Sequence, residues 1–217
     1  MSDERIIRIR PGRILPAPDW ESIRIVSGNA FDGYVRAVGN VAHASNSLHE
    51  ELAELFATIV GAERRISLAI WYSSDSDRVQ REMLRAAVIS SGMKRWLPRL
   101  PTAQEDILWM LNEANKFANR RNNAIHAPCS IVVDTKITAD IIASKTSGHQ
   151  RAKNLQGKDI LIEFDWCAGT FSVFEEFTYN AERSLASEHF PWPKRPVLPD
   201  RKPKTSLQGP PPRERPK

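Results

Sequence analysis

The chain has 217 residues, 41% of them hydrophobic and 26% charged, which is ordinary for a globular protein and enough to build a core. Its net charge of +5 belongs to its end, because residues 189–217 hold eight of the 31 lysines and arginines but only two of the 26 acidic residues. The rest is close to neutral, so charge alone does not mark the folded part as a nucleic-acid-binding protein.

The two cysteines, Cys129 and Cys167, belong to no CxxC or Cys/His cluster, which argues against a zinc site and leaves no signature of a metal or cofactor. We expect two buried thiols, with a disulfide as the alternative. Residues 1–13 interleave arginine with isoleucine, unlike a signal peptide, and no apolar run reaches transmembrane length. These patterns predict a cytoplasmic protein that does not enter a membrane.

The chain begins with a segment, residues 1–30, that we expect to be an extended arm broken by prolines. Apolar residues at spacings of three and four then predict a long amphipathic helix from about Asp32 to Val60, with a break near residues 40–47. We assign its histidines, His43 and His49, to solvent-exposed or edge positions.

The middle of the chain gives one ambiguous segment and two clear helices. Residues 62–72 fit either a strand or a helix. A second helix is predicted from the caps at 73–77 to about Ser91, where Gly92 follows as a stop signal. A third starts at a capping box, Thr102 to Glu105, and ends near His126 because Pro128 forbids continuation.

Residues 129–164 change character and are predicted to be an insertion containing strands. Cys129–Asp134 and Asp159–Phe164 are both strand-like, and the basic stretch between Lys145 and Lys158 indicates a mobile loop. A final helix is expected from about Asp165 to Glu188. The fold class is therefore mainly α, a bundle of about four long helices within residues 31–188.

The tail, residues 189–217, holds nine of the fifteen prolines and is predicted to be disordered, with Trp192 fixing its start to the body. It is interpreted as a solubilising tail. A docking segment for a protein partner or a polyanion is the alternative.

The polar residues at the end of the third helix are the best candidates in the sequence for a functional site. A helix places Asn119, Asn122, Asn123 and His126 on one stripe and Arg121 about 140° from His126. Arg121 and His126 can therefore meet only if the last turn loosens or a second protomer contributes.

These side chains suffice for metal-independent RNA cleavage by attack of the 2′-hydroxyl. A histidine exchanges protons at neutral pH, an arginine stabilises charge on the phosphorane, and an asparagine orients either partner. The candidate catalytic residues are Arg121, Asn122 and His126, and the candidate substrate-binding residues are Arg120, Asn119 and Asn123.

The string from Arg121 to His126 resembles the Arg-polar-x-x-x-His motif of the HEPN superfamily. That resemblance implies a small helical bundle, a homodimer and an endoribonuclease of toxin–antitoxin, defence or RNA-processing systems. It also implies an active site built from Arg121 and His126 of both protomers, with RNA as the partner. The other hypothesis is a non-catalytic helical module for dimerisation or interaction, whose tail docks a partner.

Overall fold

The computed structural model describes residues 19–144 and 148–201 of the chain. In these ranges the elements are α1 (Trp20–Val60), α2 (Arg64–Trp71), α3 (Asp77–Ser91), α4 (Ala103–His126), β1 (Cys129–Val133), β2 (Ala139–Ala143), α5 (Gln150–Leu155) and α6 (Ile160–Ala186). The fold is mainly α with a small two-stranded sheet, as predicted, and four of the helices are long. None of the helices in the described ranges is long and apolar enough to cross a membrane.

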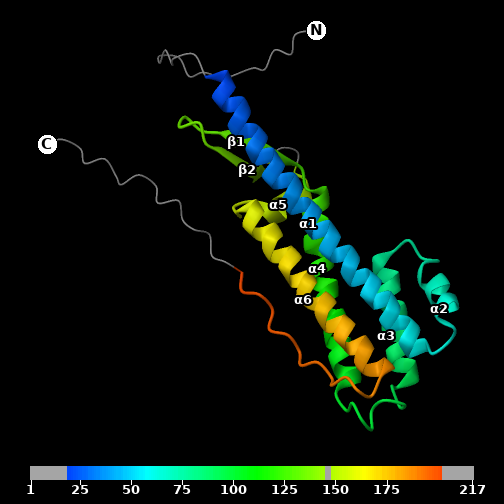
Figure 1. Cartoon of the computed structure of the whole chain (residues 1–217). Coiled ribbons are helices and arrows are strands. Elements are labelled where there is room, and N and C mark those ends of the chain that lie inside the picture. Colours follow the sequence, from blue (N-terminus) through cyan, green and yellow to red (C-terminus); the bar gives the residue numbers. More distant parts are fainter. Residues whose placement is uncertain (1–18, 145–147, 202–217) are drawn as a thin grey trace.

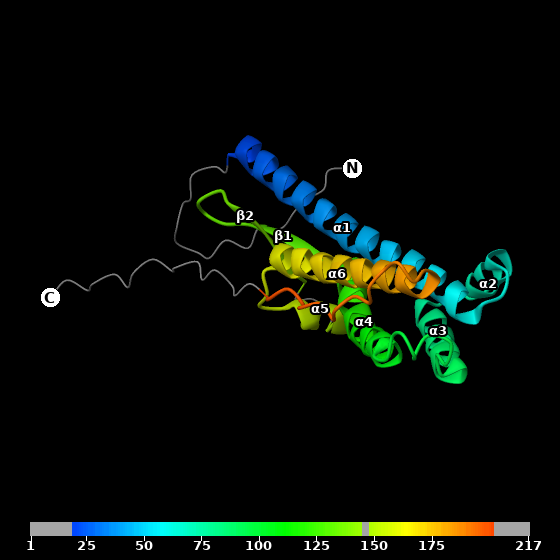
Figure 2. The ribbon, with the colours of Figure 1, turned by 60° about the horizontal axis from the view of Figure 1, so that its bottom comes forward.

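The core lies where α1 and α6 run side by side and α4 packs against both (Figure 1). Figure 2 shows the same pairing, with α2 and α3 at the C-terminal end of α1 and the hairpin near its N-terminal half. The stripe predicted for α1 is buried at Val41, Leu48 and Leu52, and that of α6 at Phe171 and Phe174. Burial of these apolar faces holds the helices together.

The start of α1 differs from the prediction of an extended arm. The helix begins at Trp20, where the Asp19 side chain accepts a hydrogen bond from the Ser22 amide at 3.2 Å and caps the first turn. Trp20 and Phe31 are exposed, so this part of the helix lacks the buried stripe that would have marked it in the sequence. The helix also continues unbroken through residues 40–47. Residues 1–18 lie outside the described ranges.

The insertion contains strands, as predicted, and they form a hairpin, but the second strand is Ala139–Ala143 and not Asp159–Phe164. β1 pairs in antiparallel register with β2, from Cys129 opposite Ala143 to Val133 opposite Ala139. The segment Asp159–Phe164, predicted as a strand, instead begins α6, where Asp159 caps the Ile162 amide at 3.0 Å. Ile160 and Phe164 are buried, four residues apart, so this apolar run follows a helical period.

The ambiguous segment 62–72 contains a helix, α2, and the signals predicted for the start and the end of α3 are confirmed. Ser76 caps α3, and Gly92 ends it in the left-handed region with φ of 54°. The predicted capping box at the start of α4 is wrong, because Thr102 makes no side-chain cap hydrogen bond. The Glu105 carboxylate meets Arg195 at 2.6 Å instead.

Residues 189–201, which we call the C-terminal strap, have no helix or strand but lie along α4 and α6 (Figure 1). Their hydrogen bonds to the helices are Ser184 Oγ to the Pro191 carbonyl, Trp192 Nε1 to Asp106, Arg195 to Glu105 and Asp106, Trp166 Nε1 to the Pro199 carbonyl, and Arg201 to Glu163. The prediction that Trp192 fixes the start of the tail to the body is confirmed. The prediction of disorder is wrong for this stretch, because its arginines and carbonyls find fixed partners as well. Residues 202–217 lie outside the described ranges.

Candidate functional site

A polar cleft of about 650 Å³ opens between α1, α3 and α4, with Phe171 of α6 also in its lining. α1 contributes Ser45, Leu48 and His49, and the segment from Asp75 to Glu82 forms the α3 side. The α4 side consists of Ala114, Asn115, Ala118, Asn119, Arg121 and Asn122. These α4 positions recur at helical spacing, so one face of that helix is directed at the cleft.

Three of the residues singled out in the sequence therefore share the cleft: Asn119, Arg121 and Asn122. Arg121 is half-buried, and its Nη1 donates to Asn122 Oδ1 at 3.0 Å. Its Nε is buried and has no hydrogen-bond partner among the described residues, where no carboxylate forms an ion pair with it either. A buried donor without an acceptor is unfavourable, and a ligand oxygen would relieve it.

Arg81 is the second guanidinium of the cleft and is only 5% exposed. Its Nε donates to Asn115 Oδ1 at 2.7 Å, and its Nη1 lies 2.9 Å from His49 Nε2. Neither partner is a carboxylate, and in the described ranges Arg81 forms no ion pair. Since a guanidinium only donates, the Nε2 of His49 must accept, which places the proton of the neutral ring on Nδ1.

His49 is held in its uncharged form by its surroundings. Burial lowers its pKa below the ordinary value of about 6.5, and the charges of Arg81 and Arg121 lower it further. Asp77, whose carboxylate lies 3.7 Å from Nε2, acts in the opposite direction without reversing the shift. The cleft thus contains a neutral imidazole at pH 7, in contact with Arg81 and under the electrostatic influence of Arg121.

Sequence reasoning missed both His49 and Arg81, although each has a readable signal. His49 is in phase with Leu52 and Phe56 on the buried stripe of α1, and Arg81 is in phase with Leu84 and Val88 on that of α3. A titratable side chain in phase with a core stripe is unusual, which makes it a candidate site residue.

His126 does not line the cleft. It is exposed in the last turn of α4, and that turn stays regular, because the Ala127 amide still donates to the Asn123 carbonyl at 3.0 Å. A loosened turn therefore does not bring His126 to Arg121, and within one chain the two side chains have different surroundings.

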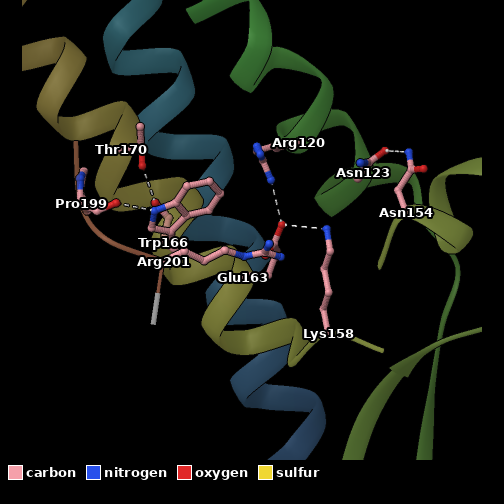
Figure 3. Close-up of polar contacts among 9 residues, drawn as sticks. All are labelled: Arg120, Asn123, Asn154, Lys158, Glu163, Trp166, Thr170, Pro199 and Arg201. Atoms are coloured by element: carbon pink, nitrogen blue, oxygen red, sulfur yellow. Dashed lines mark hydrogen bonds and ion pairs between the residues drawn. The ribbon is translucent and has the colours of Figure 1, made fainter. Parts of the chain in front are cut away.

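Arg120 and Asn123 are occupied by contacts within the fold (Figure 3). Arg120 donates to Glu163 at 3.2 Å and lies over the Trp166 ring, 4.6 Å from its centroid. Asn123 is buried, and its Oδ1 accepts a hydrogen bond from Asn154 of α5 at 3.4 Å. Both predicted substrate-binding side chains thus hold α4 to its neighbours.

The cleft also carries acidic groups at its α3 side, Asp75, Asp77 and Glu82. Asp75 and Glu82 are exposed, and Glu82 pairs with Arg85 at 3.4 Å. Because Arg81 is buried while these two carboxylates are exposed, the cleft has a positively charged interior and a partly acidic rim. The interior of such a site suits one anionic group, and the rim carboxylates can accept hydrogen bonds from polar groups around it.

Comparisons of the chain with protein-family models, curated proteins and solved structures gave no match. The function of the cleft has therefore to be inferred from its own geometry.

Proposed function

We propose that the cleft binds a phosphodiester of RNA and that the protein is a metal-independent endoribonuclease. The observation that carries this proposal is a pair of arginines, Arg81 and Arg121, in one cleft with a neutral imidazole, neither of which pairs with a carboxylate among the described residues. Guanidinium groups in that state favour a phosphate, to which they donate two parallel hydrogen bonds.

The reaction that fits these groups is attack of a ribose 2′-hydroxyl on the adjacent phosphate. The guanidinium of Arg121 stabilises the charge that builds up on the phosphorane oxygens, and a histidine takes the hydroxyl proton. Asn119 and Asn122 orient the ribose and base by hydrogen bonds, and rim carboxylates accept hydrogen bonds from base amino groups. The products are a 2′,3′-cyclic phosphate and a 5′-hydroxyl.

The test is cleavage of a fluorescent oligonucleotide with one ribonucleotide, in the presence of EDTA. Arg121→Gln should lower the rate by about 10²–10³-fold, because it removes the donor aimed at the developing charge. Arg120→Gln is the matched control, since this neighbouring residue is directed at Glu163 instead, and its rate should stay close to that of the wild type.

Two results would reject this function. The first is that homogeneous wild-type protein leaves the oligonucleotide intact. The second is that Arg121→Gln and wild type cleave equally fast. An all-deoxy oligonucleotide must remain uncut, because it lacks the attacking hydroxyl.

The second candidate function is a non-catalytic dimerisation module, and the exposed start of α1 favours it. Trp20, Phe31 and Val35 are each about half exposed or more and lie along one side of the helix. We propose that a second copy of the chain covers this face. Sedimentation velocity decides the point: wild type should sediment as a dimer and Phe31→Asp as a monomer, whereas equal sedimentation would reject this interface.

A further inference from the structure

Among the described residues that line the cleft, the one histidine is His49, which is not the histidine of the motif. It lies on α1, its side chain is 15% exposed, and its Nε2 is 2.9 Å from the guanidinium of Arg81. Arg121 lines the same cleft, whereas His126 is exposed outside it. From this geometry we infer that His49 is the catalytic base that takes the 2′-hydroxyl proton, and that Arg81 masks it until a phosphate binds. This inference rests on the proposed RNA cleavage.

The protonation state of His49 suits a base. The described groups that act on it are Asp77, Gln80 and Arg81 from the α3 side and Arg121 from α4. Burial and the two arginines together outweigh Asp77 and Gln80, so the pKa is lowered and the ring is neutral at pH 7. A neutral imidazole has a lone pair available for a proton, which an imidazolium lacks.

In the structure that lone pair is already engaged, because Nε2 accepts a hydrogen bond from Arg81 Nη1. A phosphate oxygen is charged and is a stronger acceptor than a neutral ring nitrogen. When the phosphate of RNA enters, the Nη end of Arg81 turns to it, while Asn115 keeps the Nε end in place at 2.7 Å. Substrate binding thereby exposes Nε2 to the ribose.

The chemical step then balances without a co-reactant. The 2′-hydroxyl proton moves to His49 Nε2 as the bond from O2′ to phosphorus forms. The bond from phosphorus to O5′ breaks, and O5′ takes a proton from water. His49 returns its proton to the solvent, so the ring is neutral again for the next turnover.

The experiment compares His49→Gln with His43→Gln, the same change on the same helix at an exposed histidine. The glutamine at position 49 keeps an oxygen that can accept from Arg81, which limits the loss of structure. Single-turnover cleavage by His49→Gln should fall by about 10²–10⁴-fold, while His43→Gln keeps the wild-type rate. Binding of an uncleavable 2′-deoxy oligonucleotide should be unchanged in both.

Two further measurements distinguish a catalytic base from a residue that only supports the structure. The rate of wild type should fall on the acid side with an apparent pKa below about 6.5, and this limb should be absent from His49→Gln. Added imidazole should restore part of the activity of His49→Ala. A wild-type rate for His49→Gln, with loss of cleavage in His126→Gln, would overturn the inference and leave the proposed function standing. No cleavage by wild type would instead remove the proposed function.

A further measurement uses the wild-type protein and therefore does not depend on whether a variant folds. Nitrogen NMR of labelled histidine should show His49 as the neutral Nδ1–H tautomer at pH 7 and should report a change at Nε2 when inorganic phosphate is added. An Nε2–H tautomer or an imidazolium at pH 7 would overturn the inference.

Discussion

Arg120 and Arg121 are neighbours in the chain, yet their side chains meet opposite surroundings. Consecutive residues of a helix point about 100° apart, so one reaches the α6 side of α4 and the other the cleft. Arg120 finds the buried carboxylate of Glu163 and the ring of Trp166. Among the described residues, Arg121 finds only the amide of Asn122. Under the proposed function, the contrast separates a charge that supports the fold from a charge that binds a ligand.

The same difference extends to the two faces of the molecule. On the strap side, Glu163 is met by three cations, Arg120, Lys158 and Arg201, and Asp106 is met by Trp192 and Arg195. On the cleft side, the partners of the buried Arg81 among the described residues are all neutral. Buried charges without a counter-charge lower stability, and proteins keep them mainly where function needs them.

The largest effect on stability should come from the strap side, at Glu163. Its carboxylate is 5% exposed and binds three cations, so Glu163→Gln leaves them facing one another around a neutral amide. The cations are partly exposed, which reduces the loss to about 2 kcal/mol from the 3–5 kcal/mol of fully buried pairs. Urea unfolding measures it, with Glu176→Gln on the same helix as the control. An unchanged free energy of unfolding would remove the structural role given to this cluster.

A smaller effect is expected at the strap itself. Trp192 donates its Nε1 hydrogen to Asp106 at 2.8 Å and packs edge-on against Phe177. Trp192→Phe keeps the aromatic contact and removes the hydrogen bond, so the free energy of unfolding should fall by about 1 kcal/mol. RNA cleavage should not change, because the strap lies away from the cleft lining. Loss of cleavage in this stable variant would contradict the separation of the two faces.

On the cleft side, the pH dependence of the free energy of unfolding should report on His49. The pKa of His49 is lowered in the folded chain, chiefly by burial, so below about pH 6.5 the unfolded chain binds the proton more readily. Stability is therefore fully present above that pH and declines as the pH falls through the window below it. Urea unfolding at a series of pH values should show a shallower acid decline for His49→Gln than for wild type. Parallel curves would contradict the burial assigned to this ring.

The sequence was a good guide wherever the signal was local. The stops at Gly92 and Pro128 and the long helices follow from spacing and backbone chemistry. The predicted stripe on α4 holds only in part, because Asn119 and Asn122 line the cleft together with Arg121, whereas Asn123 and His126 do not. The prediction of a strand at Asp159–Phe164 was wrong, because so short an apolar run does not distinguish a strand from the first turn of a buried helix.

Local patterns mark His49 and Arg81 one by one as polar residues in phase with core stripes, but they do not predict that the two share a site, because tertiary packing assembles it. His49 and Arg81 reach Arg121 only when α1 and α3 pack around α4, and their separation in the sequence gives no sign of it. The strap was misjudged for a related reason. Its prolines do exclude helix and strand, but Trp192 and Arg195 find carboxylates on α4 that composition does not reveal.

The smallest effect on stability should come from substitution of Arg121. A near-zero change in the free energy of unfolding is the result that we expect for a residue that belongs to a site. Within the described part of the chain its Nε is buried without a partner and no carboxylate pairs with it, so Arg121→Gln should change the free energy of unfolding by no more than about 0.5 kcal/mol. Urea unfolding beside the cleavage assay tests this directly. A residue that matters greatly for cleavage and little for stability belongs to a site, whereas a loss of stability comparable to that of Glu163→Gln would place Arg121 with Arg120 as a support of the fold.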